Sequence, residues 1–138
     1  MNPTIPESVR KLVAARADFR CEYCHLPQSV SFYRFHIDHI RSQKHDGSSD
    51  LSNLAWACPD CNYFKGTDLG SYSPTDEAQL VRFFNPRTDV WYDHFQLDGG
   101  QILGRTEIGL ATERIFKFNE TDRLIFRMQL FETGISFD

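Results

Sequence analysis

Two spacings of apolar residues divide the first half of the chain into helix and strand segments. Apolar side chains recur at helical spacing after Pro6 and predict an amphipathic helix that ends near Phe19. Residues 32–40 are rich in β-branched and aromatic side chains and predict a strand. The elements expected after this strand are a polar loop over 42–52, a short strand over 54–58 and a helix that begins at Pro59.

The pattern of apolar residues breaks over 66–74, and we expect this segment to connect the first half of the chain to a C-terminal section. A hairpin is predicted next, because Asp98-Gly99-Gly100 separates two apolar runs, 91–97 and 101–105. Two helices are expected after the hairpin: one over 107–118 that Thr106 caps, and a last one that Asn119 caps and that ends near Gly134. Packing is the favoured explanation for the many aromatic residues of this tail.

The composition fits one compact unit of the α+β class. The chain has 138 residues, of which 41% are hydrophobic and 12 are Phe, and this is enough to build a core. No apolar stretch approaches the ~18 residues that a membrane span needs, so we expect no membrane contact. We expect two parts: residues 1–69 as a core that includes the N-terminal helix, and residues 70–138 as an extension of one β-hairpin and two helices packed on that core.

Charge is unequally divided between the two halves of the chain. The net charge of −4 argues against a protein that coats nucleic acid without selectivity. Residues 1–66 carry eight Lys or Arg and seven Asp or Glu, for a charge of +1. Residues 67–138 carry seven Lys or Arg and twelve Asp or Glu, for a charge of −5. Four cations of the first half lie near the polar residues between and after the cysteine pairs, so a local positive patch is expected there: Arg34, Arg41, Lys44 and Lys65.

Four cysteines in two C-x-x-C pairs are the most specific chemical signal. Cys21 and Cys24 form the first pair, Cys58 and Cys61 form the second, and 33 residues separate the pairs. Such pairs can place four thiolates on a tetrahedral zinc ion at about 2.3 Å. Disulfides and a redox C-x-x-C are the alternatives. Because the N-terminus has no signal-peptide pattern, we expect a cytoplasmic chain with reduced thiols that bind structural zinc.

Polar residues between and after the cysteine pairs supply the groups that metal-assisted hydrolysis needs. An imidazole suits a base near neutral pH, and Asp and Asn oxygens suit a hard cation such as Mg²⁺. Strand alternation puts His36 and Asp38 on one face and His39 on the other, so we expect a bulge or bend to bring Asp38 and His39 together. The candidate residues are His36, Asp38, His39, His45, Asn53, Asn62 and Lys65.

Three runs of residues belong together: His36-Ile37-Asp38-His39-Ile40, Asp50-Leu51-Ser52-Asn53-Leu54 and Cys58-Pro59-Asp60-Cys61-Asn62-Tyr63-Phe64-Lys65. Over about residues 18–69, this combination resembles the HNH endonucleases that carry cysteines. The family is built on a ββα-metal motif, also called the His-Me finger, so the resemblance implies a treble-clef-like core. Two features depart from it: the loop reads His45-Asp46-Gly47 where many relatives have a Gly pair, and no Pro follows Ile40 closely.

The resemblance implies a role for each motif residue. His39 matches the general base, and Asp38 and Asn62 match the ligands of a catalytic divalent metal, Mg²⁺ or Mn²⁺. Asn53 matches the middle Asn, which holds the loop and the base in register. Lys65 is expected either to contact a phosphate or to lie exposed on the helix face. The four cysteines are expected to hold a separate zinc ion that fixes both ends of the motif.

The implied reaction is hydrolysis of a DNA phosphodiester bond to 5′-phosphate and 3′-hydroxyl ends. An alternative of a different class is a zinc-stabilised module that binds nucleic acid or protein without cutting. The joint presence of Asp38, His39 and Asn62 favours the enzyme. The sequence also leaves open whether the protein forms a homodimer or binds a protein partner on its C-terminal extension. His36 is a candidate partner of the site residues, and His45 is a candidate phosphate contact.

Overall fold

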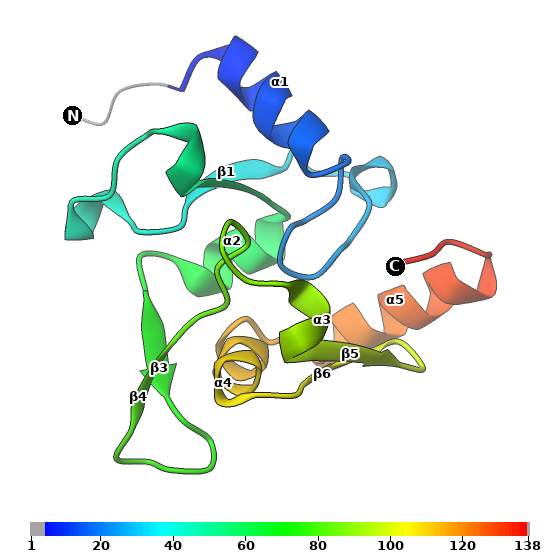
Figure 1. Cartoon of the computed structure of the whole chain (residues 1–138). Helices are drawn as coiled ribbons and strands as arrows, with labels where there is room; N and C mark the ends of the chain where they lie inside the picture. The colour runs from blue at the N-terminus through cyan, green and yellow to red at the C-terminus, as the bar shows by residue number, and fades with distance from the viewer. Residues whose placement is uncertain (1–4, 138) are drawn as a thin grey trace.

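The computed structural model describes residues 5–137 (Figure 1). Residues 1–4 and 138, which are the outer ends of the two expected parts, lie outside the described residues. The helices are α1 (Glu7–Arg16), α2 (Pro59–Lys65), α3 (Trp91–His94), α4 (Glu107–Ile115) and α5 (Thr121–Glu132). The strands are β1 (His36–His39), β2 (Leu54–Ala57), β3 (Gly70–Tyr72), β4 (Leu80–Arg82), β5 (Phe95–Asp98) and β6 (Gln101–Gly104). None of the helices between residues 5 and 137 has the length and apolar character that crossing a membrane requires.

Three antiparallel pairs of strands form the sheets of residues 5–137: β1–β2, β3–β4 and β5–β6. In the first pair, His36 lies opposite Ala57 and His39 lies opposite Leu54. The two residues between them keep the same register, so β1 contains no bulge. The combination of short sheets with helices confirms the mixed α and β character that the sequence predicts.

The first strand is shorter than its apolar pattern predicts. β1 starts at His36, and residues 32–35 belong to no strand. The partner strand explains this difference, because β2 ends at Ala57, opposite His36. Cys58, the next residue, already caps α2, so no backbone remains for residues 32–35 to pair with.

The C-terminal half contains more elements than the sequence predicts. The connection expected over 66–74 carries strand β3, which forms a further hairpin with β4. Three residues in each of these strands are too few to show an alternating pattern. The run 91–97 is also not one strand, because Trp91–His94 forms the helical turn α3 and β5 begins only at Phe95.

One of the two predicted helix caps is confirmed and the other is wrong. The hydroxyl of Thr106 accepts a hydrogen bond from the backbone N–H of Gly109 at 3.0 Å and caps α4. Asn119 does not cap α5, whose N-cap is Glu120. The Asn119 side chain instead bonds the backbone N–H and C=O of Ile102 at 2.9 and 2.8 Å, which ties β6 to the segment between the last two helices.

One cluster of buried side chains joins the two halves of the chain. Tyr23 is fully buried, and the indole N–H of Trp91 donates to its backbone carbonyl at 2.9 Å. The Tyr23 ring also lies 5.0 Å from the ring of Phe116. The cluster contains the four cysteines, all of β2, and the aromatic residues Phe83, Phe84, Phe95 and Phe118. Packing of the aromatic tail, which the sequence predicts, is therefore confirmed.

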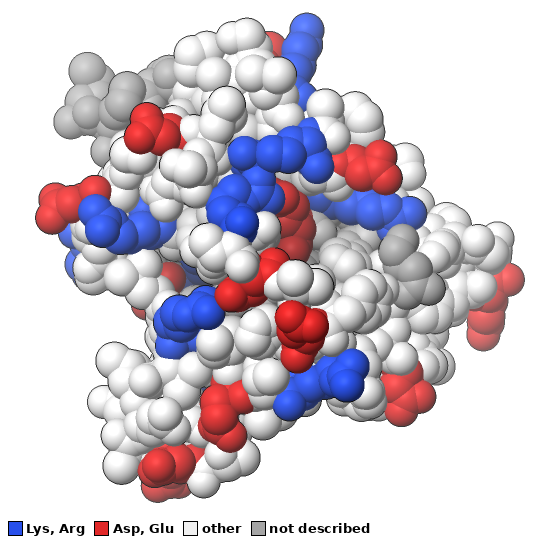
Figure 2. Space-filling model, viewed as in Figure 1, with Lys and Arg blue, Asp and Glu red and all other residues white. Residues whose placement is uncertain are grey.

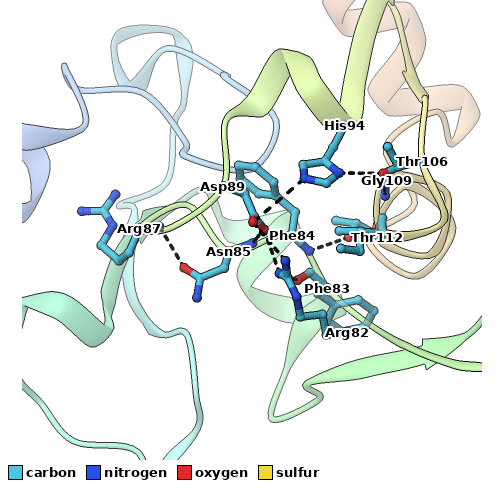
Figure 3. Close-up of polar contacts among 11 residues, drawn as sticks. Arg82, Phe83, Phe84, Asn85, Arg87, Asp89, His94, Thr106, Gly109 and Thr112 are labelled. Atoms are coloured by element: carbon cyan, nitrogen blue, oxygen red, sulfur yellow. Dashed lines mark hydrogen bonds and ion pairs between the residues drawn. The ribbon is translucent and has the colours of Figure 1, made fainter.

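Asp89 connects β4 with the segment around α3 (Figure 3). Its two oxygens accept hydrogen bonds from Arg82 at 2.8 and 3.0 Å and one from the backbone N–H of Asn85 at 2.9 Å. His94 lies 4.0 Å from Asp89, and its Nδ1 is 2.6 Å from the hydroxyl of Thr106. We interpret this network as structural, because 4.0 Å is too long for a hydrogen bond and the Thr106 hydroxyl is already the cap of α4.

The variant Asp89→Asn is expected to lower the free energy of unfolding at pH 7 by about 1.5–3 kcal/mol. The hydrogen bonds from Arg82 hold the pKa of Asp89 below its ordinary value. The ion pair therefore stabilises the fold above the pKa of an unfolded Asp, about 3.9, and this contribution is lost as the pH falls through the lower folded-state pKa. Urea unfolding of both proteins between pH 7 and pH 3 should give stabilities that converge at low pH.

The matched control for this experiment is Glu77→Gln, which removes an exposed carboxylate from the loop between β3 and β4. We expect its stability to follow that of the wild type at every pH. A stability difference for Asp89→Asn that stays constant down to pH 3 would contradict an ionic contribution and leave only a packing effect.

Candidate metal centre and active site

The four cysteine sulfurs lie together in the interior of the protein. They are within 4.8 Å of one another, and the sulfurs of Cys24 and Cys58 are 3.7 Å apart. Four sulfurs at about 2.3 Å from a tetrahedral zinc ion are roughly 3.8 Å from one another. The backbone N–H groups of Cys24 and Cys61 donate to the sulfurs of Cys21 and Cys58 at 3.5 and 3.4 Å. All four cysteines are free, and this set of donors fits a structural zinc ion.

A cation from the C-terminal helix covers the cysteine cluster. The guanidinium of Arg123 in α5 donates to the sulfur of Cys61 at 3.2 Å and lies 3.8 Å from that of Cys58. Burial lowers the pKa of Arg123, but the neighbouring cysteine sulfurs outweigh burial and raise this pKa above its ordinary value. Four thiolates around one Zn²⁺ carry a net negative charge, which this guanidinium offsets. No pattern in the sequence marks Arg123 as a neighbour of the cysteines, because it lies 62 residues after Cys61.

We expect Arg123→Met to weaken zinc binding by about 10–100-fold, because Met retains much of the volume but removes the charge next to the sulfurs. Competition with a chelator of known zinc affinity measures the change. The matched control is Arg114→Met, which removes an exposed cation from α4 and should leave zinc affinity unchanged. Equal zinc affinity in Arg123→Met and wild type would show that the guanidinium only packs against the cluster.

A hollow of about 500 Å³ lies beside β1 and α2. Asp38 and His39 line it from β1, and Asn62 lines it from α2. The other residues that line this hollow are Ile37, Ser42, Gln43, Lys44, Gly66 and Thr67. The structure therefore brings Asp38, His39 and Asn62 to one place without a bulge in β1. The chain instead bends at residues 40 and 41, directly after the strand, and residues 42–44 and α2 enclose the strand end.

Two donors hold the carboxylate of Asp38 in the interior. The hydroxyl of Tyr23 donates to Oδ2 at 2.6 Å, and the Nζ of Lys65 donates to Oδ1 at 3.1 Å. Burial raises the pKa of Asp38, whereas Lys65 and Tyr23 act in the opposite direction. A carboxylate accepts at about four sites, so each oxygen keeps a site that a cation can take. The environment of Asp38 thus fits a metal ligand whose orientation is fixed.

Lys65 lies inside the protein. Only 2% of its side chain is exposed, so the expectation of an exposed lysine on the helix face is wrong. Its Nζ donates to the backbone carbonyl of His39 at 3.0 Å in addition to Asp38. One ammonium therefore joins the end of α2 to both Asp38 and His39. We now interpret Lys65 as a positioning residue rather than as a phosphate contact.

His39 is half-buried, and a hydroxyl holds its ring. The Nε2 of His39 lies 3.0 Å from the Oγ of Ser49. Burial lowers the pKa of His39, and the nearby Asp38 raises it by less. The imidazole is therefore neutral near pH 7 and able to accept a proton. Ser49 belongs to the polar loop, where nothing in the sequence distinguishes it from its neighbours.

Asn53 fastens the loop that follows His39. Its Oδ1 accepts from the backbone N–H of Arg41 at 2.9 Å, and its Nδ2 donates to the carbonyls of Arg41 and Ser48 at 2.9 and 2.7 Å. The loop passes so close to itself that a Cβ on Gly47 would lie 1.6 Å from the carbonyl oxygen of Arg41. The loop therefore needs glycine at this position, and Asn53 holds it closed.

The two remaining histidines of the motif region lie outside the hollow. His36 and His45 are both exposed, and neither lines the space next to Asp38 and His39. The supporting role expected for His36 and the phosphate contact expected for His45 stay predictions. Both residues are the other histidines to compare with His39 by substitution.

Comparison with known proteins adds one finding. A family model described as HNH endonuclease matches residues 21–68. The matched segment contains all four cysteines together with Asp38, His39, Asn53, Asn62 and Lys65. No curated protein and no solved structure matches the chain.

Proposed function

Residues 21–68 match the HNH endonuclease family, and on this premise we propose that the protein is a metal-dependent DNA endonuclease. The proposed reaction hydrolyses a phosphodiester bond and leaves 5′-phosphate and 3′-hydroxyl ends. The observation that carries this proposal is the hollow in which Asp38, His39 and Asn62 meet. A buried carboxylate, an amide and a neutral imidazole in one hollow are the groups that metal-assisted hydrolysis needs.

In this proposal, Asp38 and Asn62 bind a single Mg²⁺ or Mn²⁺ ion. Their oxygens, completed by water, suit a hard cation of this kind. When bound, the ion supplies positive charge for the departing 3′ oxygen. Tyr23 and Lys65 contribute by holding the Asp38 carboxylate in one orientation, so that the ligand does not have to rearrange.

His39 is the proposed general base, which takes a proton from the attacking water. A positioned base of this kind typically contributes about 10²–10⁴-fold to the rate. The hydrogen bond between Nε2 and Ser49 orients the ring, and Asn53 holds the loop that precedes Ser49. Lys65 fixes the backbone of His39 relative to Asp38, which keeps the base and the metal ligand at a constant separation.

We further propose that the four cysteines hold a separate structural zinc ion in a treble-clef-like core of residues 1–69, on which residues 70–138 pack as an extension. The order along the chain supports this proposal: cysteine turn, β1, β2, second cysteine turn and α2. Because α2 carries Cys61 and Asn62 side by side, zinc at the start of this helix would also hold Asn62 in place.

Incubation with supercoiled plasmid tests the proposed activity. We expect nicked or linear plasmid in the presence of Mg²⁺ or Mn²⁺. We expect no cleavage when EDTA removes these ions at a concentration that leaves the zinc content of the protein unchanged. DNA ligase should reseal the nicks, because it requires 5′-phosphate and 3′-hydroxyl ends. Zinc content, measured by atomic absorption before and after the assay, shows that the two metals are separate.

Intact plasmid and intact single-stranded circular DNA at every concentration of divalent metal, together with a gel shift, would contradict the nuclease. That result would favour the alternative, a non-catalytic zinc-stabilised module that binds nucleic acid. Light scattering tests the remaining alternative of a homodimer, because it distinguishes a particle with the mass of one chain, 16.0 kDa, from a particle of two chains. Activity that appears only in the dimeric fraction would assign double-strand cleavage to paired copies.

A further inference from the structure

We propose that the loop before β1 carries a stacking site for unpaired bases, and that the DNA substrate therefore contains a single-stranded stretch next to the cleaved bond. This inference rests on the proposed endonuclease for the position of the cleaved bond. The two aromatic side chains of the site are Phe32, which is 101% exposed, and Tyr33, which is 76% exposed. We call Phe32, Tyr33 and Arg34 the aromatic loop.

Hydrogen bonds hold the backbone of the aromatic loop in place, so its conformation keeps the aromatic rings exposed. The hydroxyl of Ser31 donates to the carbonyl of Tyr33 at 2.8 Å and accepts from its N–H at 3.2 Å. Arg10 in α1 donates to the carbonyl of Phe35 at 2.9 Å, and the Phe35 side chain is buried. The loop is therefore fastened on both sides while Phe32 between them faces solvent.

The surface around the aromatic loop is hollowed and positively charged. A hollow of about 700 Å³ has walls that include Phe32, Tyr33 and the half-exposed Phe19. Its charged residues are Arg10, Lys11, Arg34 and Glu7, which sum to +2 on a chain whose net charge is −4. Figure 2 shows basic and acidic side chains interspersed over the face of the molecule in view. On such a surface the bases of a single strand can stack on the aromatic rings while its phosphates contact the neighbouring cations.

Shared lining residues connect this hollow, through a second one, with the candidate active site. It shares Glu7, Arg10, Arg34 and Phe35 with a second hollow, which ends at Ile37. Ile37 in turn lines the hollow that contains Asp38 and His39. His39 lies seven positions after Phe32, so the path along the chain between them is at most about 25 Å. A DNA strand that advances about 3.4 Å per nucleotide covers this path in at most about seven nucleotides.

An unpaired strand fits these features better than a duplex does. Bases inside a duplex stack on one another and expose only their edges in the grooves, so an aromatic ring on a protein surface has no base face to contact. Unpaired bases expose both faces and stack on aromatic side chains without regard to sequence. Flaps, gaps and plain single strands all provide such bases, and the aromatic loop would hold them on the same strand that enters the active site.

Fluorescence anisotropy with labelled oligonucleotides tests this inference in buffer without Mg²⁺ or Mn²⁺ and without a chelator, so that cleavage cannot interfere and zinc stays bound. The probes are a 12-nucleotide single strand and the same sequence as a blunt duplex. We expect Phe32→Ala and Tyr33→Ala each to weaken binding of the single strand by about 5- to 150-fold. Binding of the duplex should change by less than about twofold. The conservative variant Phe32→Trp should bind the single strand as tightly as the wild type.

The matched controls are Tyr72→Ala and Leu80→Ala, which remove exposed apolar side chains from the β3–β4 hairpin. They should leave the affinity for both probes unchanged. Unchanged binding of the single strand by Phe32→Ala and Tyr33→Ala would overturn the inference, and so would an equal loss for both probes, which would indicate a contact with duplex instead. The plasmid assay is independent of this result: selective loss of single-strand binding in a protein that never cuts would reject the endonuclease and keep the stacking site.

Discussion

The variant His39→Ala is expected to cleave plasmid about 10²–10⁴-fold more slowly than the wild type while it keeps its zinc and its fold. Burial lowers the pKa of His39 and favours the neutral imidazole, which can take a proton, whereas Tyr23 and Lys65 hold the Asp38 carboxylate and the amide of Asn62 is not a base. His39 is half-buried, and among residues 5–137 its side chain has a hydrogen bond to Ser49 alone, so its truncation should cost little stability. Single-turnover cleavage rates at saturating Mg²⁺ measure the loss.

The comparison variants are His36→Ala and His45→Ala, which truncate exposed histidines of the same segment outside the hollow. Each should lose much less activity than His39→Ala, because a supporting role or a phosphate contact contributes less than the base itself. Wild-type activity in His39→Ala would reject it as the base. A loss in His36→Ala or His45→Ala as large as that in His39→Ala would place the proton transfer elsewhere.

Replacing Cys24 with serine is expected to give a protein that lacks zinc and is largely unfolded at 25 °C. Structural zinc contributes about 10–16 kcal/mol of apparent free energy in small zinc-dependent folds. The total free energy of unfolding of a domain is only about 5–15 kcal/mol, so loss of the metal is comparable to the entire stability. Cys24 is fully buried in the cluster, where a serine hydroxyl cannot replace a thiolate ligand. Zinc content and the far-UV circular dichroism spectrum measure the two effects.

Removal of zinc from the wild type provides the control for this variant. A strong chelator should unfold the wild-type protein, and added Zn²⁺ should restore its spectrum, whereas Cys24→Ser should not respond to Zn²⁺. A zinc-free wild-type protein with an unchanged spectrum and melting temperature would contradict a structural role for the metal. The cysteines would then serve another purpose, such as redox chemistry.

Features encoded by neighbouring residues could be predicted from the sequence. The clustering of the cysteines is confirmed. It was predictable because each C-x-x-C pair lies on one tight turn, which places its two sulfurs close together. The cap of α4 at Thr106 is confirmed for the same reason, since a cap needs only the next three residues. The resemblance to the HNH endonucleases is confirmed over residues 21–68. The chemical roles of Asp38, His39 and Asn62 stay predictions.

The surroundings of the site residues were not predictable, because they depend on contacts between distant parts of the chain. Tyr23 lies 15 residues before Asp38, and Lys65 lies 27 residues after it. Arg123 reaches Cys61 across 62 residues. No periodicity or spacing marks such pairs, which form only when whole elements pack. Lys65 is the clearest case, since a lysine at the end of a short polar helix normally faces solvent.

In the proposed endonuclease, helix α2 would make the catalytic metal site depend on the occupancy of the zinc site. It has seven residues, with Cys58 as its cap, and carries Cys61, Asn62 and Lys65. A helix this short does not persist alone in water, so it depends on its contacts with the rest of the protein, and a zinc ion at its first turn would be foremost among them. Zinc loss would then remove Asn62 and Lys65 from the hollow together. A half-loaded preparation would be a mixture of competent and inert molecules, whose cleavage rate is halved while the Mg²⁺ requirement of the competent molecules stays the same.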